Sequence, residues 1–278
     1  MSYKHILVQS GPSLADAPRI ELAASLARRC HASLTGVFVS PPPIWRSFVP
    51  SIESAPSAQL TLAELEAERD ATVGKELELS AEALRASART HGIEPTFETI
   101  NDNLVVFAAM ARTADLTVMP APGDRGAAVI AAPDQLALAS GGPVLMTPES
   151  WSPGSAGERI LVAWDGGAEA ARALKDALPL LKQAEHIDVL IVDRDPATHE
   201  AEIVVPQFLA RHGCPSTAAR VSSVDRPVGE VMLSEAHHRD ADLIVMGLYG
   251  HSRLREVVLG GASRHLLQHS SLPLFVSH

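Results

Sequence analysis

The chain repeats itself, and this repeat constrains the fold more than any other feature of the sequence. Four short segments recur in the same order in both halves, and three of them are aliphatic runs typical of buried strands. The matching pairs are residues 5–8 with 159–162, 91–92 with 212–213, 114–119 with 241–246, and 143–146 with 273–276. A shared order of this kind is typical of a duplicated unit. The sequence therefore predicts two similar domains.

The join between the two copies lies at residues 148–155, where proline, glycine and serine dominate. This composition is typical of a linker. We therefore expect one domain at residues 1–148 and a second at residues 156–278. The length of 278 residues agrees with two domains of ordinary size. The first copy is longer because it carries an insertion after its second strand, which includes a helix expected over 60–88.

Each half alternates aliphatic strands with helical segments, a pattern that predicts a parallel sheet with right-handed crossovers. Aromatic residues are only 4% of the chain, so its cores are built from small aliphatic side chains, as in sheets covered on both faces. We expect an α/β fold of two Rossmann-like domains, each a five-stranded parallel sheet with helices on both faces. In the second half the expected strands are 159–164, 186–192, 216–222, 242–246 and 274–277, and the expected helices are 168–182, 200–211, 228–238 and 261–268.

The net charge of −10 argues against a nucleic-acid partner, because an acidic surface repels phosphates. No run of 18 apolar residues is present, so we expect no membrane partner. The start of the chain lacks the pattern of a signal peptide, and we expect a cytoplasmic protein. Cys30 and Cys214 are far apart in the sequence and are expected to be reduced thiols.

A glycine-rich segment follows the fourth strand of the second half and leads into a helix. It contains Gly247, Gly250 and Gly260, with the spacing Gly-x2-Gly-x9-Gly. Glycines let the backbone approach a ligand closely, and the free N–H groups at a helix start attract anions. Ser263 adds a hydroxyl that can donate to a ligand or cap the helix. The segment therefore predicts a phosphate site that needs no positive side chain.

This glycine spacing resembles the nucleotide loop of universal stress proteins. Residues 160–167, Ile-Leu-Val-Ala-Trp-Asp-Gly-Gly, resemble the first strand of that family and its Asp-Gly-Ser turn. The resemblance covers essentially the whole chain as a tandem, two-domain form. It implies a role in the stress response, an ATP site with magnesium as an optional companion, and pairing of the halves through their last strands, residues 143–147 and 272–277.

The resemblance also implies which residues surround the nucleotide. Ala163, Trp164 and Asp165 are expected at the end of the first strand beside the adenosine, where Trp164 either stacks on the adenine or fills a domain interface. Val192 and Asp193 are expected near the adenine. The residues expected around the ribose and phosphates, or in the loop between them, are Met246, Gly247, Gly250, His251, Ser252, Gly260, Gly261, Ala262 and Ser263.

Both halves depart from the family pattern, the first half much further. In the second half, Gly261 and Gly167 stand where the family commonly has a hydroxyl residue. In the first half, Gly11 aligns with Asp165, and Pro120 replaces the first loop glycine. We therefore expect the first half to be a structural copy and one chain to bind at most one adenine nucleotide.

No catalytic or metal-binding residues are expected. His265 and His269 share a helix face at i, i+4 spacing, but no nearby cysteine or acidic residue completes a metal site. The neighbours His251 and Ser252 lack the third group that orients a nucleophile pair. Three functions remain open: a nucleotide-binding regulator, a ligand-free tandem scaffold and a slow ATPase. The halves are expected to form an intramolecular pseudo-dimer, and a homodimer remains an open alternative.

Overall fold

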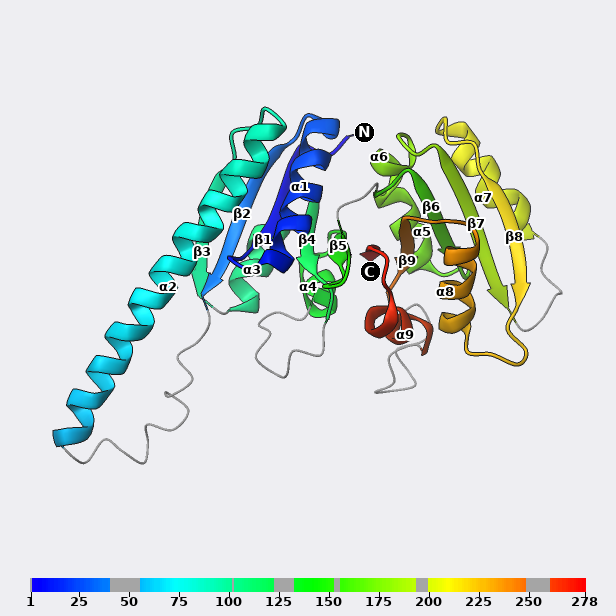
Figure 1. Ribbon diagram of the computed structural model, residues 1–278. Coiled ribbons are helices and arrows are strands. Elements are labelled where there is room, and N and C mark those ends of the chain that lie inside the picture. The colour runs from blue at the N-terminus through cyan, green and yellow to red at the C-terminus, as the bar shows by residue number, and fades with distance from the viewer. Residues whose placement is uncertain are drawn as a thin grey trace.

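The computed structural model shows one ten-stranded sheet with helices on both faces (Figure 1). It describes residues 2–40, 56–101, 103–122, 133–152, 156–193, 200–248 and 261–278, with only the backbone described at 56–62, 193 and 200–201. Within these ranges, no helix combines the length and the apolar character that crossing a membrane requires. The mostly parallel sheet and its covering helices confirm the α/β fold class expected from the sequence.

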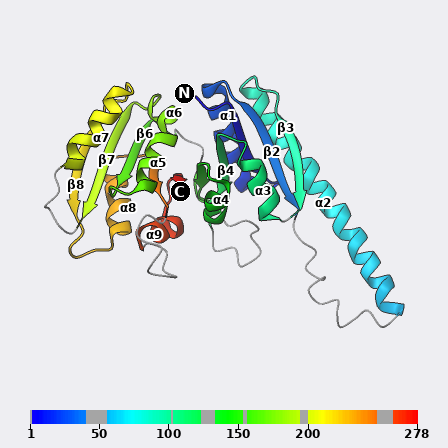
Figure 2. The ribbon, with the colours of Figure 1, turned by 180° about the vertical axis from the view of Figure 1, so that it is seen from behind.

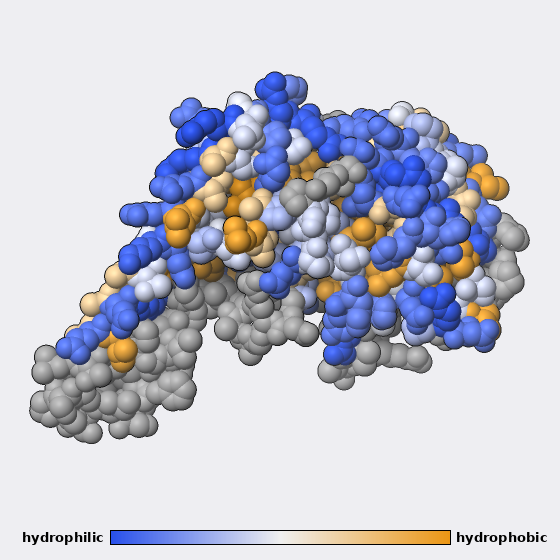
Figure 3. Space-filling model, viewed as in Figure 1, coloured by the Kyte–Doolittle hydropathy of each residue, from blue (hydrophilic) through white to orange (hydrophobic). Residues whose placement is uncertain are grey.

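The first half contributes five parallel strands in the order β3-β2-β1-β4-β5. The strands are β1 (His5–Ser10), β2 (Ser33–Ser40), β3 (Thr96–Asn101), β4 (Leu116–Pro120) and β5 (Val144–Thr147). The helices are η1 (Leu14–Asp16), α1 (Ala17–Cys30), α2 (Pro56–Thr90), α3 (Leu104–Ala111) and α4 (Pro133–Ser140). The inserted helix expected over 60–88 is present as α2, which extends beyond the sheet (Figure 1) and projects from the surface of the molecule (Figure 3).

The second half repeats this topology, with its strands in the order β10-β9-β6-β7-β8. The strands are β6 (Arg159–Trp164), β7 (His186–Asp193), β8 (Thr217–Ser222), β9 (Leu243–Gly247) and β10 (Leu274–Ser277). The helices are α5 (Ala168–Asp176), α6 (Leu178–Leu181), α7 (Glu200–Arg211), α8 (Val228–His238) and α9 (Gly261–His269). The single helix expected over 168–182 is wrong: Pro179 lies in the first turn of a separate helix, because proline is tolerated there but not in a helix interior.

The two halves meet through their last strands. β5 and β10 pair antiparallel, with Leu274 opposite Met146, Phe275 opposite Leu145 and Val276 opposite Val144. Both strands come from the segments expected to bring the halves together. The pairing removes one exposed edge from each half and leaves β3 and β8 as the edges of the joint sheet.

Two apolar cores lie on opposite faces of the sheet, and each extends through both halves. Figures 1 and 2 show the helices that cover these faces. Successive side chains of a strand point to opposite faces, so Ile6 and Val8 enter one core while Leu7 enters the other. The first core lies beneath α1, α2, α5, α6 and α7, and the second beneath α3, α4, α8 and α9. The aliphatic runs in the sequence are thus strands that are buried on both faces.

The duplication is visible at individual hydrogen bonds where the strands begin. Asp115, which precedes β4, accepts from the backbone N–H groups of residues 4 and 5 at 2.6 and 3.0 Å. Asp242, which precedes β9, accepts from those of residues 157–159 at 2.9 to 3.1 Å. In each half this aspartate fastens the start of the fourth strand to the start of the first.

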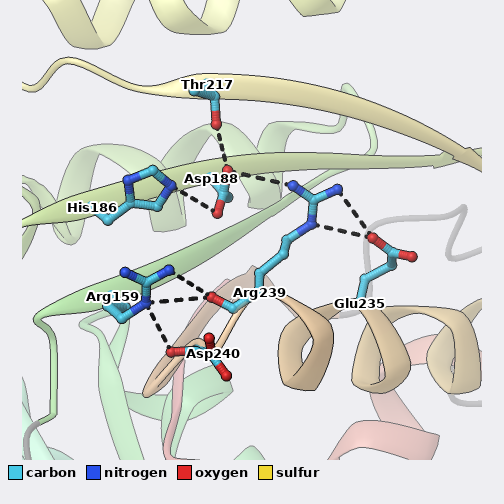
Figure 4. A network of polar contacts seen from close by, with 7 residues as sticks. All are labelled: Arg159, His186, Asp188, Thr217, Glu235, Arg239 and Asp240. Atoms are coloured by element: carbon cyan, nitrogen blue, oxygen red, sulfur yellow. Dashed lines mark hydrogen bonds and ion pairs between the residues drawn. The ribbon is translucent and has the colours of Figure 1, made fainter.

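A polar network holds the amino ends of the strands in the second half (Figure 4). Its centre is Asp188, which is buried in β7 and lies 3.2 Å from His186 Nε2 and 3.5 Å from Arg239 Nη1. The hydroxyl of Thr217 also donates to Asp188. The remaining members are Arg159, Glu235 and Asp240. Arg239 pairs with Asp188 and Glu235, while Arg159 donates to the backbone oxygens of Arg239 and Asp240, so the network ties the strand starts to the end of α8.

The joint between the halves can be tested at Phe275, a fully buried residue of β10 in the first core. We expect Phe275→Ala to lower the free energy of unfolding by about 3–5 kcal/mol, because it removes apolar contacts and leaves a cavity. The matched control is Leu14→Ala, at a side chain that is 93% exposed, with an expected change below about 0.5 kcal/mol. Urea unfolding measures both. Similar stabilities of the two variants would contradict the placement of β10 in this core.

Candidate functional site

A cavity of about 430 Å³ lies at the carboxyl ends of β6, β7 and β9. The strand order reverses between β6 and β9, and ligands of open α/β sheets bind at such a switch point. The described residues that line the cavity are Ala163, Trp164, Asp165, Ala170, Leu190, Val192, Pro227, Val228, Met232, Met246, Gly247, Gly261, Ala262 and Ser263. The cavity therefore draws on three strands and on the starts of three helices.

Most of the residues singled out in the sequence meet in this cavity. Those that line it are Ala163, Trp164, Asp165, Val192, Met246, Gly247, Gly261, Ala262 and Ser263. Asp193 ends β7, but only its backbone is described. Gly250, His251, Ser252 and Gly260 lie outside the described residues. The structure thus brings together segments of one expected site that are far apart in the sequence.

One wall of the cavity was not expected from the sequence. Pro227, Val228 and Met232, at the start and in the first turns of α8, form it. This wall is entirely apolar, and Met232 also belongs to the second core. A topological argument would have found it, because α8 begins where β8 ends, at the same edge of the sheet as the other strand ends.

The turn from β6 into α5 is fixed by Asp165 and Gly166. The backbone of Gly166 has φ = +81°, a conformation that side chains other than glycine rarely adopt. Asp165 Oδ1 accepts from the backbone N–H of Gly167 at 2.8 Å, and Gly167 is the N-cap of α5 without a side-chain cap. Asp165 therefore holds the helix start and also places a carboxylate at the cavity.

Gly247 has a packing role that is independent of any ligand. A Cβ atom at this position would lie 2.5 Å from the backbone nitrogen of Ala170 and 2.5 Å from the backbone carbon of Glu169. These distances are too short for any side chain, and the opposing atoms are backbone. The absence of a side chain at Gly247 therefore lets the end of β9 lie directly against the first turn of α5.

The start of α9 supplies the polar end of the cavity. The first three residues of the helix, Gly261, Ala262 and Ser263, all line it, and Ser263 is buried. The N–H groups of a first helical turn have no partners within the helix, and the helix dipole favours an anion beside them. Asp165 is the one ionisable side chain among the described lining residues. Among these described residues, the groups that could attract an anion are the backbone N–H groups of the helix start and the hydroxyl of Ser263.

Trp164 both lines the cavity and packs against the first core. Its neighbour Ala163 belongs to the second core, as strand alternation requires. The indole is therefore supported from the side of the sheet opposite α8. The two roles expected for Trp164, stacking on the adenine or filling a domain interface, both stay predictions.

The histidines of α9 contact each other. The rings of His265 and His269 stack with centroids 4.4 Å apart, and His269 Nδ1 lies 3.0 Å from the backbone oxygen of His265. Among the described residues, no group of three His, Cys, Asp or Glu side chains is placed to hold a metal ion.

The packing role of Gly247 predicts a contrast between two glycines of the cavity. We expect Gly247→Ala to lower the free energy of unfolding by about 1–3 kcal/mol, since β9 and α5 must move apart. A Cβ atom at Gly261 would meet nothing within 4 Å, so Gly261→Ala should keep the stability within about 0.5 kcal/mol or raise it. Urea unfolding of both variants measures the contrast. An equal loss of stability in both would show that the close approach at Gly247 is not what makes this position sensitive.

Comparison with known proteins agrees with this topology. The model of the universal stress protein family matches residues 157–278. None of the curated proteins compared with the chain matches it.

Three solved structures illustrate the likeness. A universal stress protein from Archaeoglobus fulgidus is 17% identical, with a TM-score of 0.70 over 98% of this chain and 97% of its own. A putative universal stress protein from Pseudomonas aeruginosa is 16% identical, with a TM-score of 0.60 over 99% of this chain and 93% of its own. A universal stress protein in complex with cAMP aligns over 52% of this chain and 97% of its own at 18% identity, with a TM-score of 0.30.

The two full-length likenesses show that the whole chain has the fold of universal stress proteins, with both halves included. The match to the family model adds sequence similarity in the second half, where the cavity lies. Residues 157–278 are therefore similar in sequence to the universal stress protein family, and the whole chain has the fold of its solved members.

Proposed function

We propose that the second half binds one adenine nucleotide, ATP with magnesium, and that the protein is a cytoplasmic nucleotide-binding regulator of the stress response. The observation that carries the proposal is the cavity at the switch point, which has an apolar wall at one end and a helix start at the other. In this proposal residues 156–278 are the binding domain and residues 1–148 a structural domain that lacks a nucleotide site.

The apolar part of the cavity fits a nucleobase. Leu190, Val192 and Met232 line it from β7 and α8, and all three contribute to the second core. Pockets for small ligands are typically apolar, with a few polar groups that fix the orientation, and their volumes start at roughly 300 Å³. A cavity of about 430 Å³ falls in this range. An adenine nucleotide with its base against this wall would reach the start of α9 with its phosphates.

The phosphate end fits a nucleotide that carries its own cation. The N–H groups of residues 261–263 are suited to phosphate oxygens. Asp165 is the single carboxylate among the described lining residues, too few ligands for a metal site made of protein alone. Magnesium keeps several waters and binds through one or two carboxylates together with phosphates, and when bound it would neutralise part of the phosphate charge. The residues present therefore fit magnesium as a companion of ATP.

The first half differs at the equivalent strand ends. The strand registers place Gln9 where the second half has Ala163, and Ser10 where it has Trp164. The side-chain oxygen of Gln9 is buried, and the Ser10 hydroxyl lies 2.8 Å from the hydroxyl of Ser80 in α2. A long amide thus occupies the position at which the second half needs a small residue. These differences favour one nucleotide per chain.

Gly261 offers a clean test of the phosphate end, because a side chain there meets nothing within 4 Å. We expect calorimetric titration of the wild-type protein with ATP and magnesium to give one site per chain. Gly261→Asp should weaken binding at least about tenfold, corresponding to about 1.4 kcal/mol, because its charge opposes the phosphates. The acidic residue suits the first turn of a helix, so the fold should not suffer.

Gly261→Asn is the matched control, with nearly the same shape and no charge, and should change the affinity less than about threefold, or about 0.7 kcal/mol. Equal weakening by Asp and Asn would contradict a phosphate at this helix start. A wild-type protein that gives no heat, and that releases no nucleotide when denatured, would instead favour the ligand-free tandem scaffold.

A further variant at residue 261 tests whether the absence of a hydroxyl there weakens the binding of ATP. Gly261→Ser supplies the side chain that the family commonly carries, and a hydrogen bond to a charged group contributes about 1.5–3 kcal/mol. We therefore expect ATP to bind about tenfold or more tightly to Gly261→Ser, measured by the same titration. Unchanged or weaker binding would contradict the position assigned to the phosphates.

A further inference from the structure

We propose that Gly229 is a positioning residue, which sets the spacing between the two walls that grip the nucleotide. Gly229 lies in the first turn of α8, is buried, and does not line the cavity. Val228, which precedes it in sequence, and Ala262, which lies opposite it in space, both line the cavity. The inference rests on the proposed function, because it assigns base and phosphate to opposite walls of that same cavity.

The contact between α8 and α9 passes directly through Gly229. A Cβ atom at this position would lie 2.6 Å from His265 Cβ and 3.0 Å from the backbone oxygen of Ala262. Neither opposing atom is the free end of a flexible side chain. Any side chain at residue 229 therefore has to push the start of α9 away from α8.

This contact joins the two ends of the cavity. On the α8 side, Val228 precedes Gly229 and Met232 follows one turn later, and both form the apolar wall. On the α9 side, Ala262 belongs to the helix start that is suited to phosphate. The distance across Gly229 therefore determines how far the apolar wall lies from the phosphate end.

The other ends of the two helices are also joined. His237 Nε2, near the end of α8, lies 3.2 Å from the hydroxyl of Ser271, which follows α9. Figures 1 and 2 both show α8 and α9 next to each other. A pair of helices fastened at the far end responds to a side chain at Gly229 mainly at its near end, which is the end at the cavity.

The first half has no glycine at the equivalent helix contact, that between α3 and α4. The equivalent helix α3 has the sequence LVVFAAMA, which contains no glycine. The close approach of the two helices through a glycine is thus confined to the half that is proposed to bind a nucleotide. A glycine needed only for folding of this topology would be expected in both halves.

The test compares a ligand that spans both walls with one that contacts a single wall. Gly229→Ala moves the walls apart, so we expect it to weaken binding of ATP with magnesium about tenfold or more. Adenosine, which lacks the phosphates assigned to the start of α9, should lose less than about threefold. Calorimetric titration of the full chain measures both affinities. A purely structural role of Gly229 would lower both affinities by the same factor.

Two further variants keep the inference open to refutation. Gly74→Ala is the matched control, since Gly74 is also a helical glycine but a Cβ atom there meets nothing within 4 Å, and it should leave both affinities unchanged. The double variant Gly229→Ala/His265→Gly removes the closest opposing atom and should recover part of the lost ATP affinity.

An equal loss for ATP and adenosine, an unchanged ATP affinity in Gly229→Ala, or no recovery in the double variant would overturn the role of Gly229 while the proposed function stands. A wild-type protein that does not bind ATP would overturn both. Circular dichroism and urea unfolding of each variant check that it is folded before titration.

Discussion

The antiparallel pairing of β5 with β10 is the interaction on which the rest of the molecule depends. It joins two sheets of the same topology into one, and each of the two apolar cores extends across the joint into both halves. A strand that pairs on both sides has no exposed edge, so each half protects the other from edge-to-edge association. The two halves are therefore joined along one continuous sheet.

Within this frame, two copies of one topology have been shaped differently by a few small residues. In the second half, Gly247 lets β9 lie against α5, and Gly229 lets α8 lie against α9. Each contact brings backbone close to backbone at the edge of the same cavity. In the first half the equivalent of Gly247 is Pro120, and α3 has no glycine. The halves share one strand order, and these close approaches are one of the features by which they differ.

Much of this architecture could be predicted from the sequence, because aliphatic runs and the repeat report directly on buried parallel strands. The bounds of β6, α7, α8 and β10 agree with the expected ranges. The break between α5 and α6 was missed because the pattern of apolar residues continues across Ala177, and only Pro179 marks it. The joining of the two sheets into one is a feature of the tertiary structure, and no local sequence pattern predicts it.

The candidate site could be predicted only in part, for a related physical reason. Motif spacing marks residues that a ligand touches, so Asp165, Gly247 and Ser263 were identified as expected members of the cavity. The apolar wall at Met232 carries no motif, since one methionine on a helix reads like any other core residue. The sequence also contains no signal for Gly229, because its importance depends on the atoms of Ala262 and His265 that lie opposite it in α9.

Hydrogen–deuterium exchange of the full chain, with and without ATP and magnesium, tests the central assignment most directly. If the second half holds a nucleotide between α8 and α9, exchange should slow at the starts of these helices and after β6. The equivalent starts of α3 and α4 in the first half should exchange at unchanged rates. Equal slowing in both halves, or no slowing at the start of α9, would contradict the assignment.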